Sequence, residues 1–326
     1  MKRRHLLLAA FAAPFAAWGQ QAGREYRIVV GFVQGDELTR RLTGVIRQRL
    51  ASHGFVEGKN LRIELTTDAC CGEHYAREKA RAMLALRPDA VLTFGTVLAR
   101  AFQKETTSVP LVFAQVYDAL DAGIVPNLAR PGGNVTGVST RHSELAVKRL
   151  ELIRELLPKA KRVALFGYFW DPAFRAAEPA LRKAAAKLRI ELIDVDQMSG
   201  SWEVPLRKAT DAGAAAVLTY QPLSGGGQRF TADALVAFCR ERRVALVVSD
   251  SDDTALGALA SYGTDAALIA HHAADHLARV LKGERPGDIS VDQISTFELV
   301  VNLKTAKAIG LKIPGPVLAR ADRVIE

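Results

Sequence analysis

Two histidines four residues apart have the spacing of metal ligands. His272 and His276 fall in a segment with helical periodicity, and Asp275 lies beside them. This spacing can place two imidazoles on one face of a helix, where they could share a zinc ion. His276, however, falls close to the apolar stripe that contains Ile269 and Leu277, and His272 lies on its flank. We therefore favour packed or surface histidines and predict no metal site.

Glycine-rich segments are the other candidates for chemistry, because backbone N–H groups in such turns can hold phosphate. Residues 224–228 read SGGGQ after a strand-like run but lack the Lys-Ser/Thr pair of a phosphate loop. Either they bind an anion or, as we favour, they form a plain loop. Residues 128–140, LARPGGNVTGVST, place the glycines before a strand rather than before a helix. That order predicts an architectural joint, not a phosphate site.

Other catalytic patterns are absent from the sequence. It contains no G-x-S-x-G elbow, no Walker A motif, no G-x-G-x-x-G after a strand and no H-E-x-x-H helix. We therefore expect neither an enzyme nor a bound cofactor.

The composition indicates a chain with a large core and no nucleic-acid surface. The chain has 326 residues, of which 49% are hydrophobic, and this length predicts about two domains. The 44 Lys and Arg residues exceed the 35 Asp and Glu residues, giving a formal net charge of +9. The basic residues alternate with acidic and polar ones along helical segments, without a basic run that carries aromatics. This pattern predicts solvated helix faces and no nucleic-acid partner.

The N-terminus has the pattern of a cleaved export signal. Residues 1–5 read MKRRH, residues 6–17 are apolar, and Ala17-Trp18-Gly19 fits a small-x-small cleavage site. We expect residues 1–19 to be removed, by either the general or the twin-arginine route, and the mature protein to be periplasmic. No Cys lies at the cleavage site to carry a lipid anchor. Cys70 and Cys71 could form a strained vicinal bridge, whereas Cys239 is expected to be a buried free thiol.

Short apolar runs alternate with amphipathic segments from residue 26 onward. The strand-like runs cover residues 27–33, 61–65, 90–94, 110–116, 135–139, 162–166, 190–195, 215–220 and 244–248. The helix-like segments cover residues 37–52, 75–86, 97–104, 143–157, 174–188, 202–212 and 228–242. Such alternation predicts an α/β fold with two doubly wound parallel sheets.

Several blocks of sequence resemble a known family. They are GFVEGKN at 54–60, PLVF at 110–113, LARPGGNVTG at 128–137, KRLEL at 148–152, FELVVNLKTAK at 297–307 and LARAD at 318–322. In order and spacing they are similar to the ABC-transporter substrate-binding family that has tryptophan- and tyrosine-binding members. The resemblance implies a type I periplasmic-binding fold, in which two lobes joined by a three-segment hinge close on a ligand. It also implies a membrane permease as the partner and a monomeric chain.

The chain departs from the family pattern at several places near the implied site. The usual Gly-Thr-Pro-Ala is Gly-Thr-Val-Leu at 95–98, Gly-Asp-Pro is replaced at 116–119, and an Asn-Pro turn reads YFWDP at 168–172. A segment often rich in aromatics is SDSDD at 249–253. The resemblance therefore does not carry over an aromatic amino-acid ligand. It predicts a first lobe of residues 24–139 and 258–295 and a second lobe of residues 140–257 and 296–326.

Ligands of parallel α/β sheets bind beyond the carboxyl ends of the strands, and polar or aromatic residues stand there in both lobes. The candidate ligand-binding residues are Gln34, Gly95, Thr96, Tyr117, Asp118, Trp170, Asp171, Gln221 and Asp250.

These residues suggest a solute with a carboxylate and a cationic or hydroxyl-rich end. Thr96 opens a helix and could hold a carboxylate, or it is a plain N-cap. Asp118 could accept an ammonium group or cap a helix, and Asp171 before a proline favours capping. Asp250 could bind the solute or only cap a helix. Tyr117 and Trp170 could form walls of the site or belong to the core.

The leading hypothesis is a solute-binding protein that delivers an amino acid or related carboxylate to a permease. A sensory module that reports the same solute to a membrane receptor needs the same closing lobes, and the sequence does not separate the two. An exported enzyme on a similar scaffold is the third alternative.

The mature chain is expected to begin near Gln20 or Gln21. N-terminal sequencing of the protein from fractionated cells tests this, and an intact Met1 on cytosolic protein would contradict the export signal.

Overall fold

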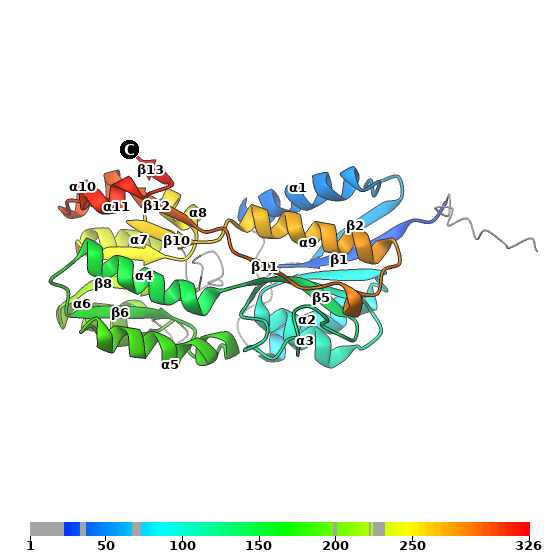
Figure 1. Ribbon diagram of the computed structural model, residues 1–326, viewed down its shortest axis with the longest axis horizontal. Helices are drawn as coiled ribbons and strands as arrows, with labels where there is room; N and C mark the ends of the chain where they lie inside the picture. Colours follow the sequence, from blue (N-terminus) through cyan, green and yellow to red (C-terminus); the bar gives the residue numbers. More distant parts are fainter. Residues whose placement is uncertain (1–22, 33–36, 67–72, 198–200, 222, 224–231) are drawn as a thin grey trace, which may run out of the picture.

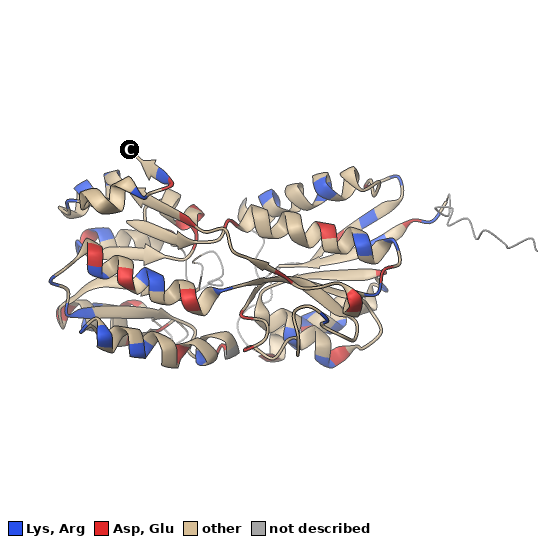
Figure 2. Cartoon of the chain, viewed as in Figure 1, with Lys and Arg blue, Asp and Glu red and all other residues tan. Residues whose placement is uncertain are grey.

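Two α/β lobes lie side by side along the long axis of the molecule (Figure 1). The computed structural model describes residues 23–32, 37–66, 73–197, 201–221, 223 and 232–326. Within these residues no helix is long and apolar enough to cross a membrane. Basic and acidic residues are interspersed on the outer helices of both lobes (Figure 2).

The first lobe is built on a parallel sheet that has, among the described residues, six strands in the order β11-β5-β4-β3-β1-β2. The strands are β1 (Tyr26–Gly31), β2 (Leu61–Thr66), β3 (Ala90–Phe94), β4 (Leu111–Tyr117), β5 (Val135–Thr140) and β11 (Asp292–Ile294). Its helices are α1 (Glu37–Ser52), α2 (Glu73–Ala85), α3 (Thr96–Glu105) and α9 (Ala266–Leu281), and a short turn, η2 (Pro286–Asp288), precedes β11.

The second lobe is built on a sheet that has, among the described residues, seven strands in the order β13-β12-β10-β9-β8-β6-β7. The strands are β6 (Arg162–Gly167), β7 (Glu191–Asp196), β8 (Ala214–Thr219), β9 (Ala245–Val248), β10 (Ala260–Gly263), β12 (Glu298–Asn302) and β13 (Arg323–Ile325). The helices are α4 (His142–Leu156), α5 (Pro172–Lys187), α6 (Glu203–Asp211), α7 (Ala232–Glu241), α8 (Ser251–Leu256), α10 (Leu303–Ile309) and α11 (Gly315–Ala319). Strand β12 pairs antiparallel with β10, whereas the other recorded pairs are parallel.

Each sheet is buried on both faces, which explains why the strands read as apolar runs. In the first lobe, α1 and α9 cover one face and α2 and α3 cover the other. In the second lobe, α4, α5, α10 and α11 cover one face and α6 and α7 cover the other. These layers confirm the predicted α/β fold with two doubly wound sheets.

The chain passes between the two sheets at three places within the described residues. The passages follow β5, β10 and β11, at residues 140–142, 263–266 and 294–298. The second passage differs from the sequence-based expectation, because β10 pairs with β9 and β12 of the second sheet. A boundary at residue 258 would have placed this strand in the first lobe, so the chain leaves the second lobe about six residues later.

The glycine-rich joint leads into β5 rather than directly out of the first lobe. Gly132 and Gly133 both have left-handed φ angles, of 72° and 60°, which glycine adopts without a steric cost. The N–H of Gly132 donates to the carbonyl of Gly287 at 3.1 Å, so the turn packs on the segment that precedes β11. The passage between the lobes then follows at the end of β5.

Strand β4 carries a β-bulge that redirects its last residues. The pairing of β4 with β5 shifts register between Phe113 and Val116, and Gln115 has a φ of 53°. Phe113 and Val116 consequently lie on the same face of the sheet, which simple alternation over three residues would not allow. The bulge thereby sets the direction of Tyr117, the last residue of the strand.

Gly137 in β5 allows the close approach of β4, and we expect Gly137→Ala to destabilise the fold by about 2 kcal/mol or more. A Cβ at this position would lie 2.0 Å from the carbonyl oxygen of Phe113, and the φ of Gly137 is 152°. Gly44 in α1 is the matched control, since a Cβ there meets nothing within 4 Å. Gly44→Ala should stabilise the protein by roughly 0.5–1 kcal/mol. Urea unfolding of both variants measures the difference, and equal stabilities would contradict the tight β4–β5 packing.

Candidate functional site

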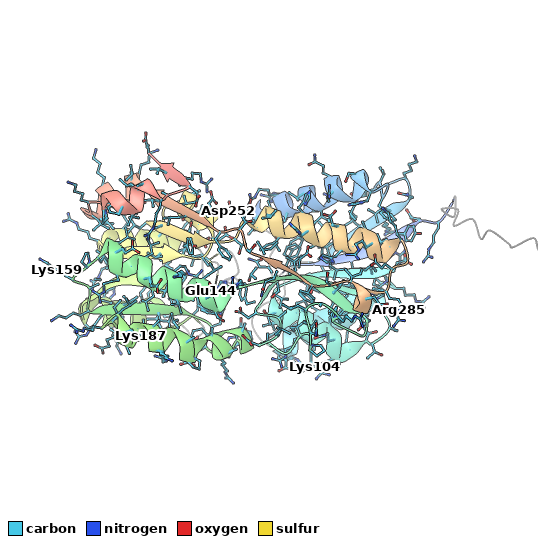
Figure 3. All side chains as sticks on the ribbon, in the orientation of Figure 1. Lys104, Glu144, Lys159, Lys187, Asp252 and Arg285 are labelled. Atoms are coloured by element: carbon cyan, nitrogen blue, oxygen red, sulfur yellow. The ribbon has the colours of Figure 1, made fainter. Side chains whose placement is uncertain are left out.

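The carboxyl ends of the central strands of both sheets are directed toward the junction between the lobes. We call this junction the seam; its described residues include Gly95, Thr96, Tyr117, Asp118, Tyr168, Trp170, Asp171, Gln221 and Asp250. Helices α3 and α5 contact each other across it. Arg41 of α1 forms an ion pair with Asp252 of α8, and Figure 3 labels Asp252 at the junction. Gln34, also proposed as a ligand-binding residue, lies outside the described residues.

The N-terminus of α3 is the clearest anion site at the seam. Its N-cap is Gly95, with φ 92° and ψ 153°, and no side chain among the described residues caps it. Thr96 is therefore the first helical residue, and the interpretation of Thr96 as a plain N-cap is wrong. Its buried hydroxyl instead accepts the backbone N–H of Tyr117 at 3.2 Å. The first N–H groups of this ten-residue helix keep their positive field, which favours an anion.

Tyr117 belongs to the core, where it joins the two lobes. Its ring comes from the first sheet but packs within the core of the second lobe and is only 7% exposed. It stacks on the imidazole of His142, with ring centroids 3.9 Å apart and planes at 18°, and lies edge-on to Tyr220. Burial raises the pKa of Tyr117 well above its ordinary value, so the phenol stays neutral. The alternative role of a ligand wall is not needed to explain this ring.

Asp118 holds the start of α4. Its Oδ2 accepts the backbone N–H of Ser143 at 2.8 Å and the Ser143 hydroxyl at 2.6 Å. The residue has a φ of 46° and is half-buried, and burial raises the pKa of its carboxyl group. Both recorded bonds end on the same oxygen, so the capping role leaves Oδ1 able to accept a further donor.

Asp171 and Gln221 form a polar network on the second-lobe side. Asp171 caps α5, its Oδ1 accepting the N–H of Ala173 at 2.8 Å, which confirms the predicted cap. Gln221 accepts the N–H of Tyr168 at 3.2 Å through Oε1, and its amide nitrogen lies 3.5 Å from Asp171 Oδ2. Burial raises the pKa of Asp171, and the positive charge of Arg100 in α3, across the seam, opposes the rise.

Trp170 provides an unused donor at the same edge. Its indole Nε1 is buried and has no hydrogen-bond partner among the described residues. The ring lies 6.0 Å from that of Tyr168, centroid to centroid. A buried N–H without an acceptor is costly, so an acceptor supplied by a solute would be favoured here.

Asp250 is both a helix cap and a buried acid. Its Oδ1 accepts the N–H of Asp252 at 2.9 Å at the start of α8, so the capping interpretation is confirmed. The side chain is 4% exposed, and burial raises its pKa to about 7. The charge of Arg41 acts in the opposite direction, whereas Asp252 and Asp265 add to the rise.

The histidines singled out by their spacing bind a carboxylate of the same lobe. His272 Nδ1 lies 2.8 Å and His276 Nε2 3.2 Å from Asp292 Oδ2, which ties α9 to β11. These contacts lower the pKa of Asp292 to about 2. Across the described part of the chain, no group of three or more His, Cys, Asp or Glu residues has metal-binding geometry.

Of the predictions about cysteines and the glycine-rich loop, only the one about Cys239 falls on described residues. Cys239 is a buried free thiol, as expected, and burial raises its pKa. Cys70, Cys71 and the glycine-rich residues 224–228 lie outside the described residues.

Sequence reasoning missed the cationic side chains that approach the seam. Arg41 and Arg100 lie inside helices, so a search restricted to strand ends passes over them. Arg149 lies in the KRLEL block, but nothing in that block indicates that its guanidinium is fully buried.

Comparisons with known proteins agree with this architecture. A family model described as ABC transporter substrate binding protein matches residues 28–325. A tyrosine-binding protein of Clostridioides difficile strain R20291 is 27% identical over 281 residues, which cover 86% of this chain and 79% of the relative.

Two solved structures share the whole fold. A conserved domain protein of Vibrio cholerae O1 biovar El Tor strain N16961 has a TM-score of 0.81 and 26% identity, over 92% of this chain and all of that one. An ABC domain from Streptococcus pneumonia, in complex with L-Trp, has a TM-score of 0.80 and 22% identity over the same shares. At that identity the second match shows the fold alone.

The buried acid Asp250 predicts a pH-dependent stability. An acid whose pKa is raised in the folded state binds its proton more tightly in the folded protein. Its contribution to the free energy of unfolding therefore falls as the pH rises from about 4 towards 7. Asp250→Asn keeps a capping oxygen and removes the buried charge. The melting temperature of the variant minus that of wild type should therefore be larger at pH 8 than at pH 4.5.

The exposed acid Asp322, whose Oδ2 accepts the N–H of Leu299 at 2.7 Å, provides the control variant Asp322→Asn. A difference between Asp250→Asn and wild type that is the same at both pH values would contradict the buried-acid assignment.

Proposed function

Because the chain belongs to the family of ABC transporter substrate-binding proteins, we propose that it binds a small solute between its two lobes and delivers it to a membrane permease. The observation that carries the proposal is the family match over residues 28–325, together with the two-lobe fold. The place of action is the periplasm, in keeping with the N-terminal export pattern. The proposed role is binding, with no catalytic step.

The proposed solute is an amino acid or a related carboxylate. The uncapped N-terminus of α3 at Gly95 would receive the carboxylate. The free oxygens of Asp118 and Asp250 would accept donors from a cationic or hydroxyl-rich end. The tyrosine-binding protein, the relative that is 27% identical, supports the same solute class.

Closure of the lobes would complete the site. Two bodies are proposed to move. The first lobe comprises residues 24–139 with 258–295, and the second lobe comprises residues 140–257 with 296–326. Strand β10 is the exception, because it moves with the second lobe. The three passages between the sheets act as the hinge. The Arg41–Asp252 ion pair across the seam would favour the closed arrangement.

A thermal-shift screen of the mature protein tests the function. The panel contains the twenty L-amino acids and, as controls, dicarboxylates without an amino group. At 100 times its dissociation constant a true solute stabilises the protein by about 2.7 kcal/mol. We expect at least one amino acid to raise the melting temperature and the dicarboxylates to leave it unchanged. A panel in which no amino acid has an effect would contradict the proposed solute class.

A pair of variants at Val97 tests the place of the carboxylate. Val97 is half-buried in the first turn of α3. Val97→Glu puts a negative charge into that turn, where it stabilises the helix but repels a bound carboxylate. Val97→Gln has the same shape without the charge. We expect the glutamate variant to bind the best amino acid of the panel about tenfold more weakly than the glutamine variant, or about 1.4 kcal/mol. Equal affinities in calorimetry would show that the carboxylate binds elsewhere.

A further inference from the structure

Arg149 in α4 is a fully buried cation without an acidic partner. Its side chain is 0% exposed, and the ion pairs recorded for the described residues do not include it. Burial lowers the pKa of its guanidinium to about 10, so the group is still charged at neutral pH. A buried charge that no opposite charge compensates is unfavourable for folding. Stability alone therefore gives no reason for an arginine at this position.

The guanidinium instead bridges the backbone of two strands. Nη1 donates to the carbonyl of Tyr262 in β10 at 3.1 Å, and Nη2 lies 3.4 Å from the carbonyl of Tyr220, directly after β8. Strand β9 lies between these two strands in the sheet, so the planar fork spans it from the α4 side. The Nε atom has no partner among the described residues. Arginine can make such a two-point contact because its donors are held in one plane.

His142, two turns before Arg149 on the same face of α4, connects this bridge to the first lobe. Its Nε2 lies 3.3 Å from Arg149 Nη2 and donates to the Tyr220 carbonyl, which can only accept. Burial and the nearby guanidinium lower the pKa of His142 far below its ordinary value, so the ring is neutral. The ring also stacks on that of Tyr117 from β4 and lies edge-on to that of Tyr220.

Tyr220 continues into the polar network of the seam. Its hydroxyl donates to the carbonyl of Ala173 at 3.1 Å in the first turn of α5. The next residue, Gln221, receives the N–H of Tyr168 and approaches Asp171. The carbonyl held by Arg149 is thus one residue from the side chain that organises the second-lobe edge.

From this geometry we propose that Arg149 is a positioning residue for solute binding. Its fork fixes the Tyr220–Gln221 turn relative to β10, the strand from which the chain passes back to the first lobe. The second-lobe edge of the site is thereby held in its binding geometry before the solute arrives, and its position is tied to the hinge. Arg149 does this without touching the solute. The effect on affinity rests on the proposed function, whereas the effect on the edge can be measured without any solute.

Arg154 on the same helix provides a matched control. Its guanidinium also donates to backbone carbonyls, to Pro158 at 2.7 Å and to Leu188 at 2.6 Å, but at the opposite end of α4. Arg149→Met and Arg154→Met remove the same charge and the same kind of contact. Arg149→Lys keeps the charge but offers a single nitrogen, which cannot serve both carbonyls.

Hydrogen exchange of the backbone amide of Tyr168 is the first readout, because its acceptor is the side chain of Gln221. We expect exchange at least tenfold faster in Arg149→Met and Arg149→Lys than in wild type, and unchanged in Arg154→Met. The melting temperature of Arg149→Met should stay near that of wild type, since an apolar side chain replaces an unpaired buried charge. Local loosening without global destabilisation separates positioning from a merely structural role.

Unchanged exchange in Arg149→Met, or equal acceleration in Arg154→Met, would overturn the proposal. A further outcome is that the Tyr168 amide exchanges at the wild-type rate in Arg149→Lys and faster only in Arg149→Met. This outcome would show that a single nitrogen is enough, and it would overturn the role assigned to the two-point contact.

Calorimetry with L-tyrosine and L-tryptophan as probes gives the second readout. Where wild type binds a probe, Arg149→Met should bind it at least tenfold more weakly and Arg154→Met within twofold; equal affinities would contradict the positioning role. Binding of neither probe by wild type would count against the proposed solute class, while hydrogen exchange would still decide the role of Arg149.

Discussion

The insertion of the Tyr117 ring into the core of the second lobe is the contact on which the rest of the structure depends. A bulge in β4 directs this ring across the junction, where it stacks on His142 at the start of α4. The neighbouring Asp118 holds the same helix turn through Ser143. The lobes therefore meet at a packed aromatic contact in addition to the three chain passages that connect the sheets. In the proposed closure, such a contact would let the lobes rotate about a fixed point while each keeps its own core.

Electrostatics across the seam complement this pivot. The first lobe faces the junction with the uncapped end of α3 and with Arg41 and Arg100, and the starts of the second-lobe helices α4, α5 and α8, which lie opposite, are capped by acids. Asp171 and Asp250 each cap the N-terminus of their own helix, whereas no described side chain caps α3 of the first lobe. In the proposed function this asymmetry would give an amphoteric solute a defined orientation. Its carboxylate would face the first lobe, and its donors would face the acids.

The sequence predicted the strands and helices up to residue 248, because buried parallel strands and amphipathic helices leave strong periodic patterns. It also predicted the Asp171 cap, since a local Asp-Pro pair determines that geometry. It failed where distant contacts decide. Strand β10 was assigned to the first lobe because its pairing with β12 depends on residues about forty positions later. The buried guanidinium of Arg149 is visible only once Tyr262, 113 residues away, lies against it.

Small-angle X-ray scattering with and without solute tests the central claim most directly. The mature protein is measured alone and with a saturating concentration of the amino acid that gives the largest thermal shift. A clamp that closes about the Tyr117 pivot predicts a smaller radius of gyration in the saturated sample, with secondary structure unchanged by circular dichroism. A radius that stays the same at proven saturation would contradict closure of the lobes on the solute.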